Sequence, residues 1–166
     1  MASEPLDFAE FYASAKDDCL RVVLASTGDL PAAEDLVAEA FARAWAAWRT
    51  VSRHPAPRAW VVRTALNTRV SWWRRRHREV ALGQADGPAV LSGDGSDPVD
   101  TQLMAAVARL PLRQRQVVGL RLFLDLDTAS TAEVLGIAPG TVTAHLTRAI
   151  AGLREEFTSA RGQEKP

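Results

Sequence analysis

Arginine is concentrated in one short stretch of this chain. Between Val51 and Arg78 there are eight arginines and no Asp or Glu, although the whole sequence balances 20 Lys+Arg against 20 Asp+Glu. Residues 1–50 and 79–100 are both acidic. Guanidinium groups neutralise phosphate and form charge-assisted hydrogen bonds with it. This charge asymmetry therefore indicates a nucleic-acid surface, even in a chain whose net charge is zero.

The basic stretch also has helical spacing. With about 100° of rotation per residue, cations, an amide, a hydroxyl and an aromatic ring share one arc of roughly 80°. The members of this polar arc are Trp60, Arg63, Asn67, Ser71, Arg74 and Arg78. Mostly apolar residues fill the remainder, which predicts a helix packed on one side. An amide can pair with adenine and a ring can stack on an exposed base, whereas the alternative is a solvated basic helix.

Few other residues could bind a metal, act in catalysis or form a disulfide. The three histidines, His54, His77 and His145, lack the spacing of a metal site or a catalytic triad. The single cysteine, Cys19, excludes an intramolecular disulfide, and its place on an apolar helix face predicts a core residue. We therefore expect a protein that is not an enzyme and needs no cofactor or metal.

The elements that position these residues are predicted to be helices. Apolar residues recur at spacings of three and four from about Asp7 to Ser26, and Gly28 follows this first helix. Prolines in the segment Val51–Pro57 predict a loop before the basic helix, which restarts at about Arg58.

A second helix is predicted between the first helix and this loop. Its opposite face carries Asp35, Glu39 and Arg43, which form either a solvated surface or a docking surface for a basic partner. Its apolar seam is expected to be core and consists of Leu36, Val37, Ala40, Phe41, Ala44, Trp45 and Trp48.

The segment from Glu79 to Asp100 has four Gly, two Pro, five acidic residues and no basic ones. This composition predicts a flexible anionic linker between two modules. The opposite charges of the linker and the basic helix favour a closed form of the free chain, in which the linker masks that helix.

The second module is predicted to contain a helix-turn-helix. Helices are expected over residues 101–110 and 112–123, where Gly119 would be a weak point costing about 1 kcal/mol relative to Ala. A short helix from Thr128 to Leu135 then ends at Gly136, and Pro139 opens the last helix. Such a turn lets the second helix enter a major groove; the alternative is a helical hairpin without a DNA role.

Four segments, in this order, resemble bacterial sigma factors of the extracytoplasmic-function (ECF, group 4) class, of actinobacterial type. They are AAEDLVAEAFARAW at 33–46, PRAWVVRTALNTRVSWWRRR at 57–76, LPLRQRQVV at 110–118 and AEVLGIAPGTVTAHLTRAIAGLR at 132–154. The resemblance implies an all-α fold of two small helical domains. A three- or four-helix region 2 bundle would span residues 1–78, the acidic linker 79–100 and a region 4 helix-turn-helix domain 101–157, with a tail over 158–166.

The resemblance also implies roles for particular residues. The chain would bind core RNA polymerase through its β′ clamp helices and β flap, direct it to promoters and melt the minus-10 region. Docking on the clamp helices would use Asp35, Glu39 and Arg43. Binding of the minus-10 element, duplex and single-stranded, would use His54, Trp60, Arg63, Asn67, Ser71, Arg74, Arg75 and Arg76. Recognition of the minus-35 element would use Thr141, Thr143, Ala144, His145, Thr147 and Arg148.

Several positions depart from the family pattern. The family usually has basic residues at the positions of Thr143 and His145, so we predict a weak or unusual minus-35 contact with fewer released counterions. Thr131 stands where the family has an apolar residue, and with Gly119 it predicts a marginally stable second domain. Ala38 stands where the family often has Gln.

Three other functions stay open from the sequence. A helix-turn-helix regulator would bind duplex DNA without polymerase, and a chain that has lost initiation activity would only titrate an anti-sigma protein. An enzyme is the third class. An anti-sigma protein is also a candidate partner of an active sigma factor. The N-terminus has no signal-peptide core and no apolar run reaches the ~20 residues of a membrane span, so we expect a cytoplasmic protein without membrane insertion.

Overall fold

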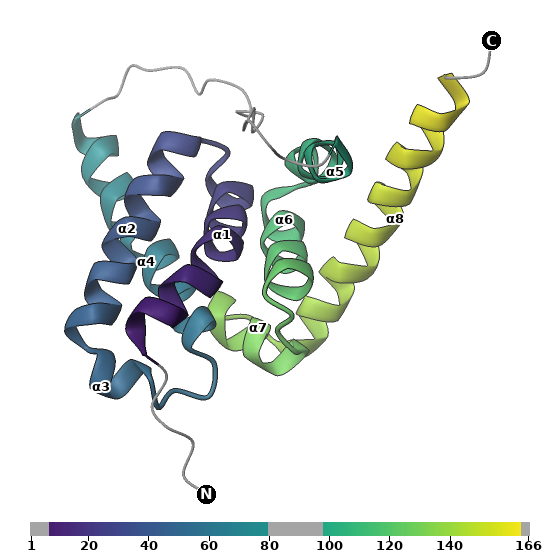
Figure 1. Ribbon diagram of the computed structural model, residues 1–166. Helices are drawn as coiled ribbons and strands as arrows, with labels where there is room; N and C mark the ends of the chain where they lie inside the picture. The colour runs from purple at the N-terminus through teal and green to yellow at the C-terminus, as the bar shows by residue number, and fades with distance from the viewer. Residues whose placement is uncertain (1–6, 80–97, 164–166) are drawn as a thin grey trace, which may run out of the picture.

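The computed structural model describes residues 7–79 and 98–163 of the chain, and the side chains of residues 7–69 and 101–162. The described residues form helices and no strand, which confirms the all-α prediction (Figure 1). The elements are α1 (Phe8–Thr27), α2 (Leu30–Ala46), α3 (Trp48–Val51), α4 (Pro57–Glu79), α5 (Pro98–Ala108), α6 (Leu112–Val118), the π-helical turn η1 (Gly119–Phe123), α7 (Thr128–Leu135) and α8 (Pro139–Gln163). No helix in the described parts is long and apolar enough to cross a membrane.

Three boundaries differ from the sequence prediction. The helix expected over residues 112–123 changes from α to π geometry at Gly119, where each turn takes up an extra residue. α5 begins at Pro98, inside the predicted linker, because proline is well tolerated in a first helical turn. α8 continues to Gln163, past the predicted start of the tail at Thr158, because no proline interrupts it.

The first module is a bundle in which α1, α2 and α4 contact one another. Its core contains Val22, Phe41 and Val61 among its buried residues. Cys19 is fully buried, which confirms it as a core residue. This core fixes one face of α4 and leaves the other available for function.

The predicted core position of Trp45 is wrong. Its side chain is 66% exposed, although it meets Phe8 edge to face at 4.8 Å between ring centroids. Since α2 ends at Ala46 and α1 begins at Phe8, Trp45 lies in the last turn of α2, opposite the first residue of α1. Trp48, in α3, is half-buried and packs against Phe11.

The helix-turn-helix is confirmed. Asp127 caps α7, since its carboxylate accepts a hydrogen bond of 2.7 Å from the backbone N–H of Ser130. Gly136 ends α7 with a φ of 64°, a left-handed conformation that glycine adopts without a Cβ clash. Beyond this turn α8 packs on α6 and α7 through Val142, which is fully buried.

The two modules are in contact. α1 touches α6 and η1, and α4 touches α7, as their adjacent positions in Figure 1 show. Leu120, Leu124 and Leu126 of the second module belong to the same buried cluster as the core of the first. One hydrophobic core therefore runs across the predicted domain division.

Candidate nucleic-acid and polymerase interfaces

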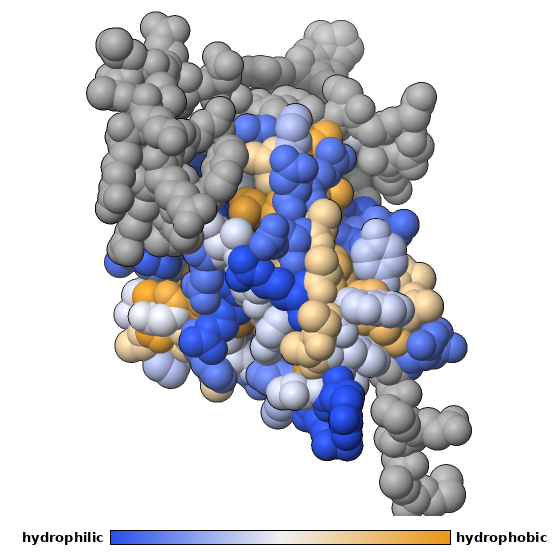
Figure 2. All heavy atoms as spheres, turned by 90° about the vertical axis from the view of Figure 1, so that its left-hand side faces the viewer, coloured by the Kyte–Doolittle hydropathy of each residue, from blue (hydrophilic) through white to orange (hydrophobic). Residues whose placement is uncertain are grey.

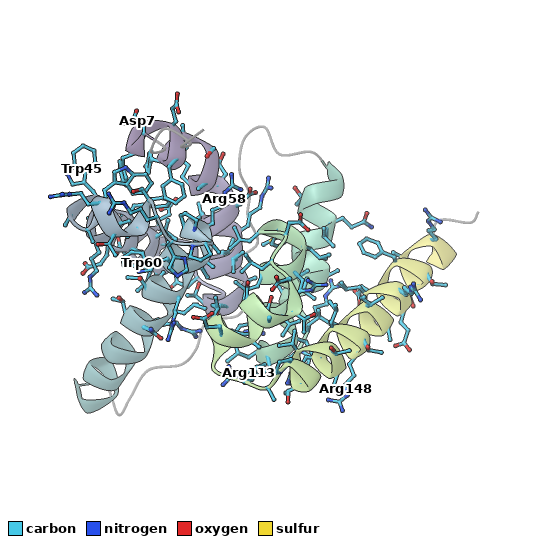
Figure 3. All side chains as sticks on the ribbon, turned by 90° about the horizontal axis from the view of Figure 1, so that it is seen from below. Asp7, Trp45, Arg58, Trp60, Arg113 and Arg148 are labelled. Atoms are coloured by element: carbon cyan, nitrogen blue, oxygen red, sulfur yellow. The ribbon has the colours of Figure 1, made fainter. Side chains whose placement is uncertain are left out.

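The two faces of α4 differ as its sequence predicts. Val61, Val62 and Ala65 are fully buried. On the polar arc, Arg63 and Asn67 are exposed, and Trp60, labelled in Figure 3, is half-buried. The helix backbone continues to Glu79, but the side chains of Ser71, Arg74, Arg75 and Arg76 lie outside the described residues.

His54 has a local structural role. Its Nδ1 accepts a hydrogen bond of 3.0 Å from the backbone N–H of Ala56, so the histidine fixes the turn that leads into α4. With Trp60 and Arg63 it lines a cavity of about 170 Å³. The structure thus brings three predicted minus-10 residues together, although only one ring nitrogen of His54 is left for a ligand.

α7 forms the other wall of this cavity. Ser130, Glu133 and Val134 line it, and a Glu133 carboxylate oxygen lies 3.7 Å from Nη1 of Arg63. The polar arc of α4 and the first helix of the helix-turn-helix therefore face each other.

Two arginines of the basic stretch serve the fold. Arg58 donates to the Asp18 carboxylate at 3.1 Å and to the Ser14 carbonyl at 3.0 Å. Arg69 donates to the Ser26 carbonyl at 2.8 Å. Both arginines lie outside the polar arc, but their partners on α1 could not be foreseen from the sequence.

A cluster of polar contacts surrounds the last turn of α1, and sequence reasoning did not find it. Arg115 donates from Nε to the Ala25 carbonyl at 2.7 Å, and Gln116 donates from Nε2 to the Ser26 hydroxyl at 2.9 Å. Burial lowers the pKa of the Arg69 and Arg115 guanidinium groups, and the charge of Arg115 lowers the pKa of Arg69 further. Helix C-termini favour such cations because their last carbonyls lack intrahelical partners.

The predicted polymerase-docking residues share an exposed face of α2. Asp35, Glu39 and Arg43 are all exposed, and both Nε and Nη2 of Arg43 donate to Oε1 of Glu39, at 3.1 and 2.8 Å. Figure 2 looks at the side of the molecule that lies on the left in Figure 1, where α2 is seen, and hydrophilic residues (blue) occupy much of the surface there that is not grey. Asp35 thus carries an exposed negative charge one helical turn from the ion pair of Glu39 and Arg43.

The predicted minus-35 residues divide into two groups. Thr141, Thr143, Thr147 and Arg148 are exposed, whereas Ala144 and His145 are half-buried. Nδ1 of His145 is buried and has no hydrogen-bond partner among the described residues.

The hydroxyl protons of two threonines are already used within α8. Thr143 donates to the Pro139 carbonyl at 3.3 Å, and Thr147 donates to the Thr143 carbonyl at 2.9 Å. Arg148 points away from the body of the molecule, at the end opposite Trp45 (Figure 3). Of the predicted minus-35 residues, Arg148 is the arginine, and its side chain is exposed.

The fold and these surfaces define a two-module helical protein with a helix-turn-helix. Residues 11–79 match the family model for sigma-70 region 2, and residues 100–153 match that for sigma-70 region 4. The chain is 33% identical to the RNA polymerase sigma-E factor of Streptomyces coelicolor over 94% of its own length and 89% of that protein. It therefore belongs to the sigma-70 family, in the group of ECF RNA polymerase sigma factors.

Further relatives agree with this assignment. The ECF RNA polymerase sigma factor SigL of Mycobacterium tuberculosis is 33% identical, over 81% of this chain and 79% of that protein. Among solved structures, the sigma factor RpoE of Bartonella quintana, in complex with the anti-sigma factor NepR, superposes with a TM-score of 0.75 at 22% identity. That match covers 92% of this chain and 97% of RpoE, so the similarity of fold includes both modules.

Proposed function

We propose that this chain binds core RNA polymerase and directs it to promoters, reading the minus-10 element with α4 and the minus-35 element with α8. The observation that carries the proposal is the exposed polar face of α4. It places a ring, a guanidinium group and an amide, from Trp60, Arg63 and Asn67, on a helix whose opposite face is held in the core.

This face suits single-stranded DNA better than a major groove. A ring that lines a cavity can stack on a base that has left the duplex, and the neighbouring cation can neutralise the strand that holds this base. Arg74, Arg75 and Arg76 follow on the same helix and would hold the phosphates of the upstream duplex. Melting itself would draw on the isomerisation of polymerase.

Docking on polymerase would use α2. Asp35 and the ion-paired Glu39 and Arg43 are displayed together on one side of this helix, where they can meet basic residues of the β′ clamp helices. The second module would contact the β flap, and the acidic linker would follow the polymerase cleft. The chain would act at the nucleoid in the cytoplasm, under the control of an anti-sigma protein of the kind that its structural relatives bind.

Transcription in vitro with purified core polymerase tests the proposal. With fragmented genomic DNA as template, we expect discrete transcripts only when core and chain are both present. Asp35→Lys should weaken the core complex at least tenfold because it reverses an exposed charge on α2, whereas Glu155→Lys, on the exposed side of α8, should not. Sequence-specific duplex binding without any polymerase-dependent transcript would instead identify a conventional regulator.

A further inference from the structure

Two half-buried arginines from different helices meet at the last turn of α1. Arg69 of α4 donates from Nη1 to the Ser26 carbonyl at 2.8 Å and to the Ser26 hydroxyl at 3.3 Å. Arg115 of α6 donates from Nε to the Ala25 carbonyl at 2.7 Å. Because consecutive Cα atoms are about 3.8 Å apart, the two guanidinium groups are anchored at neighbouring points of one backbone turn.

These two arginines lack the carboxylate partner that others in the chain have. Arg43, Arg58 and Arg109 each form an ion pair with an acidic side chain. Within the described parts of the chain, neither Arg69 nor Arg115 forms one. The charge of Arg115 also lowers the pKa of Arg69, which indicates that the two positive charges are close enough to repel each other.

The end of α1 offsets only part of this positive charge. The C-terminus of an α-helix carries about half a negative charge, so two guanidinium groups beside it leave an excess of roughly one and a half positive charges. A phosphate monoester carries about 1.5 to 2 negative charges at pH 7. A single phosphate group therefore matches the charge that the pair of arginines leaves uncompensated.

Both guanidinium groups keep N–H groups for a ligand. The hydrogen bonds of these residues use Nη1 of Arg69 and both Nε and Nη1 of Arg115. The other nitrogens of the two groups are absent from the buried, unpartnered polar atoms of the described residues, so solvent reaches them. Arg115 is held a second time by the Leu110 carbonyl, at 2.9 Å, which fixes its orientation before a ligand arrives.

We propose that Arg69 and Arg115 form a binding site for a phosphate dianion, which is either free phosphate or the terminal phosphate of a nucleotide. The bound anion accepts charge-assisted hydrogen bonds from both guanidinium groups and relieves the repulsion between them. The inference goes beyond the proposed function and does not rest on it, because the free chain binds this anion without polymerase or promoter DNA.

Titration of the full chain with inorganic phosphate tests the site, at constant ionic strength and in a buffer without other oxyanions. Isothermal titration calorimetry should show saturable binding of one phosphate per chain. Arg69→Gln and Arg115→Gln should each weaken this binding at least tenfold, because only one guanidinium group remains. Arg154→Gln is the matched control, since it removes an exposed arginine of α8 and should leave phosphate binding unchanged.

A measurement on the parent chain guards against misfolding of the variants, because both arginines also hold the end of α1. In a chain with isotope-labelled arginine, two side-chain Nε–H signals in the NMR spectrum should shift saturably, with the dissociation constant that calorimetry gives. The signal of Arg154, assigned through its variant, should not shift. Absence of any saturable shift would overturn the inference even if the variants failed to fold.

Titration with ADP separates the two sources of phosphate. Tighter binding of ADP than of phosphate, lost in the same two variants, assigns the site to a nucleotide, whereas equal or weaker binding of ADP assigns it to free phosphate. Phosphate binding that both variants retain would overturn the inference. So would binding of single-stranded DNA that both variants lose while phosphate fails to bind, because the two arginines would then hold a nucleic-acid backbone.

Discussion

Thr131 is a buried side chain with an unmet hydrogen bond. It is fully buried in α7, and its hydroxyl has no partner among the described residues. An unpaired buried hydroxyl costs about 1–3 kcal/mol. Its position matches the departure from the family pattern noted in the sequence, and the unpaired hydroxyl supports the prediction of a marginally stable second domain.

Replacing Thr131 with valine should therefore stabilise the protein. Valine keeps the branched shape and removes the hydroxyl, so Thr131→Val should raise the free energy of unfolding by about 1 kcal/mol, as urea denaturation would measure. Thr158→Val, at an exposed position on α8, should change it by less than about 0.5 kcal/mol. A fall in stability for Thr131→Val would show that the hydroxyl has a partner in solution.

Cys19 should be inert in the folded protein. Burial raises the pKa of its thiol to about 12, so the thiolate that alkylating agents attack is scarce. At pH 8.5, near the pKa of a free thiol, iodoacetamide should modify the native chain at least a hundred times more slowly than the urea-unfolded chain, as mass spectrometry can follow. Comparable rates would mean that α1 opens readily around Cys19.

Among the helices and turns, the sequence predicted the structure correctly where the residues of a segment alone determine its backbone conformation. The turn between α7 and α8 was predicted correctly because Gly136 permits a left-handed conformation and Pro139 fixes its own φ at the start of α8. The burial of Trp45 was predicted wrongly because the spacing of apolar residues along α2 does not show where the neighbouring helix α1 begins. Gly119 was predicted only as a weak point of a helix, because helix propensity says nothing of a partner such as Val22, which lies almost a hundred residues earlier.

α8 leads to a prediction about the minus-35 contact. Because Arg148 alone carries charge among the predicted contacts, protection at minus-35 should be weak. Arg148→Ala should reduce the magnitude of the salt slope of holoenzyme binding by about 1, the value for one phosphate contact. Arg154→Ala, two turns further along α8, is the control for loss of charge. Strong footprint protection that collapses with Arg148→Ala alone would contradict the weak contact.

At the scale of the whole molecule, the sequence predicted two modules but not how they meet. The contacts between Ser26 and Gln116 join residues 90 positions apart, and neither residue has a sequence feature that points to the other. Backbone and neutral groups at the end of α1 accept the hydrogen bonds that Arg115 and Gln116 of the second module donate. This contact between the modules should therefore resist moderate salt better than a contact made by charge alone would.

We propose that the polar face of α4 holds melted promoter DNA. Permanganate reactivity of the minus-10 thymines in holoenzyme–promoter complexes tests this most directly, because it detects unpaired bases. In Trp60→Ala/Asn67→Ala these thymines should lose their reactivity while the complex with core polymerase persists. The control Trp45→Ala/Gln102→Ala removes an exposed ring and an exposed amide elsewhere and should keep the reactivity. Unchanged reactivity in the Trp60→Ala/Asn67→Ala chain would remove these residues from the mechanism.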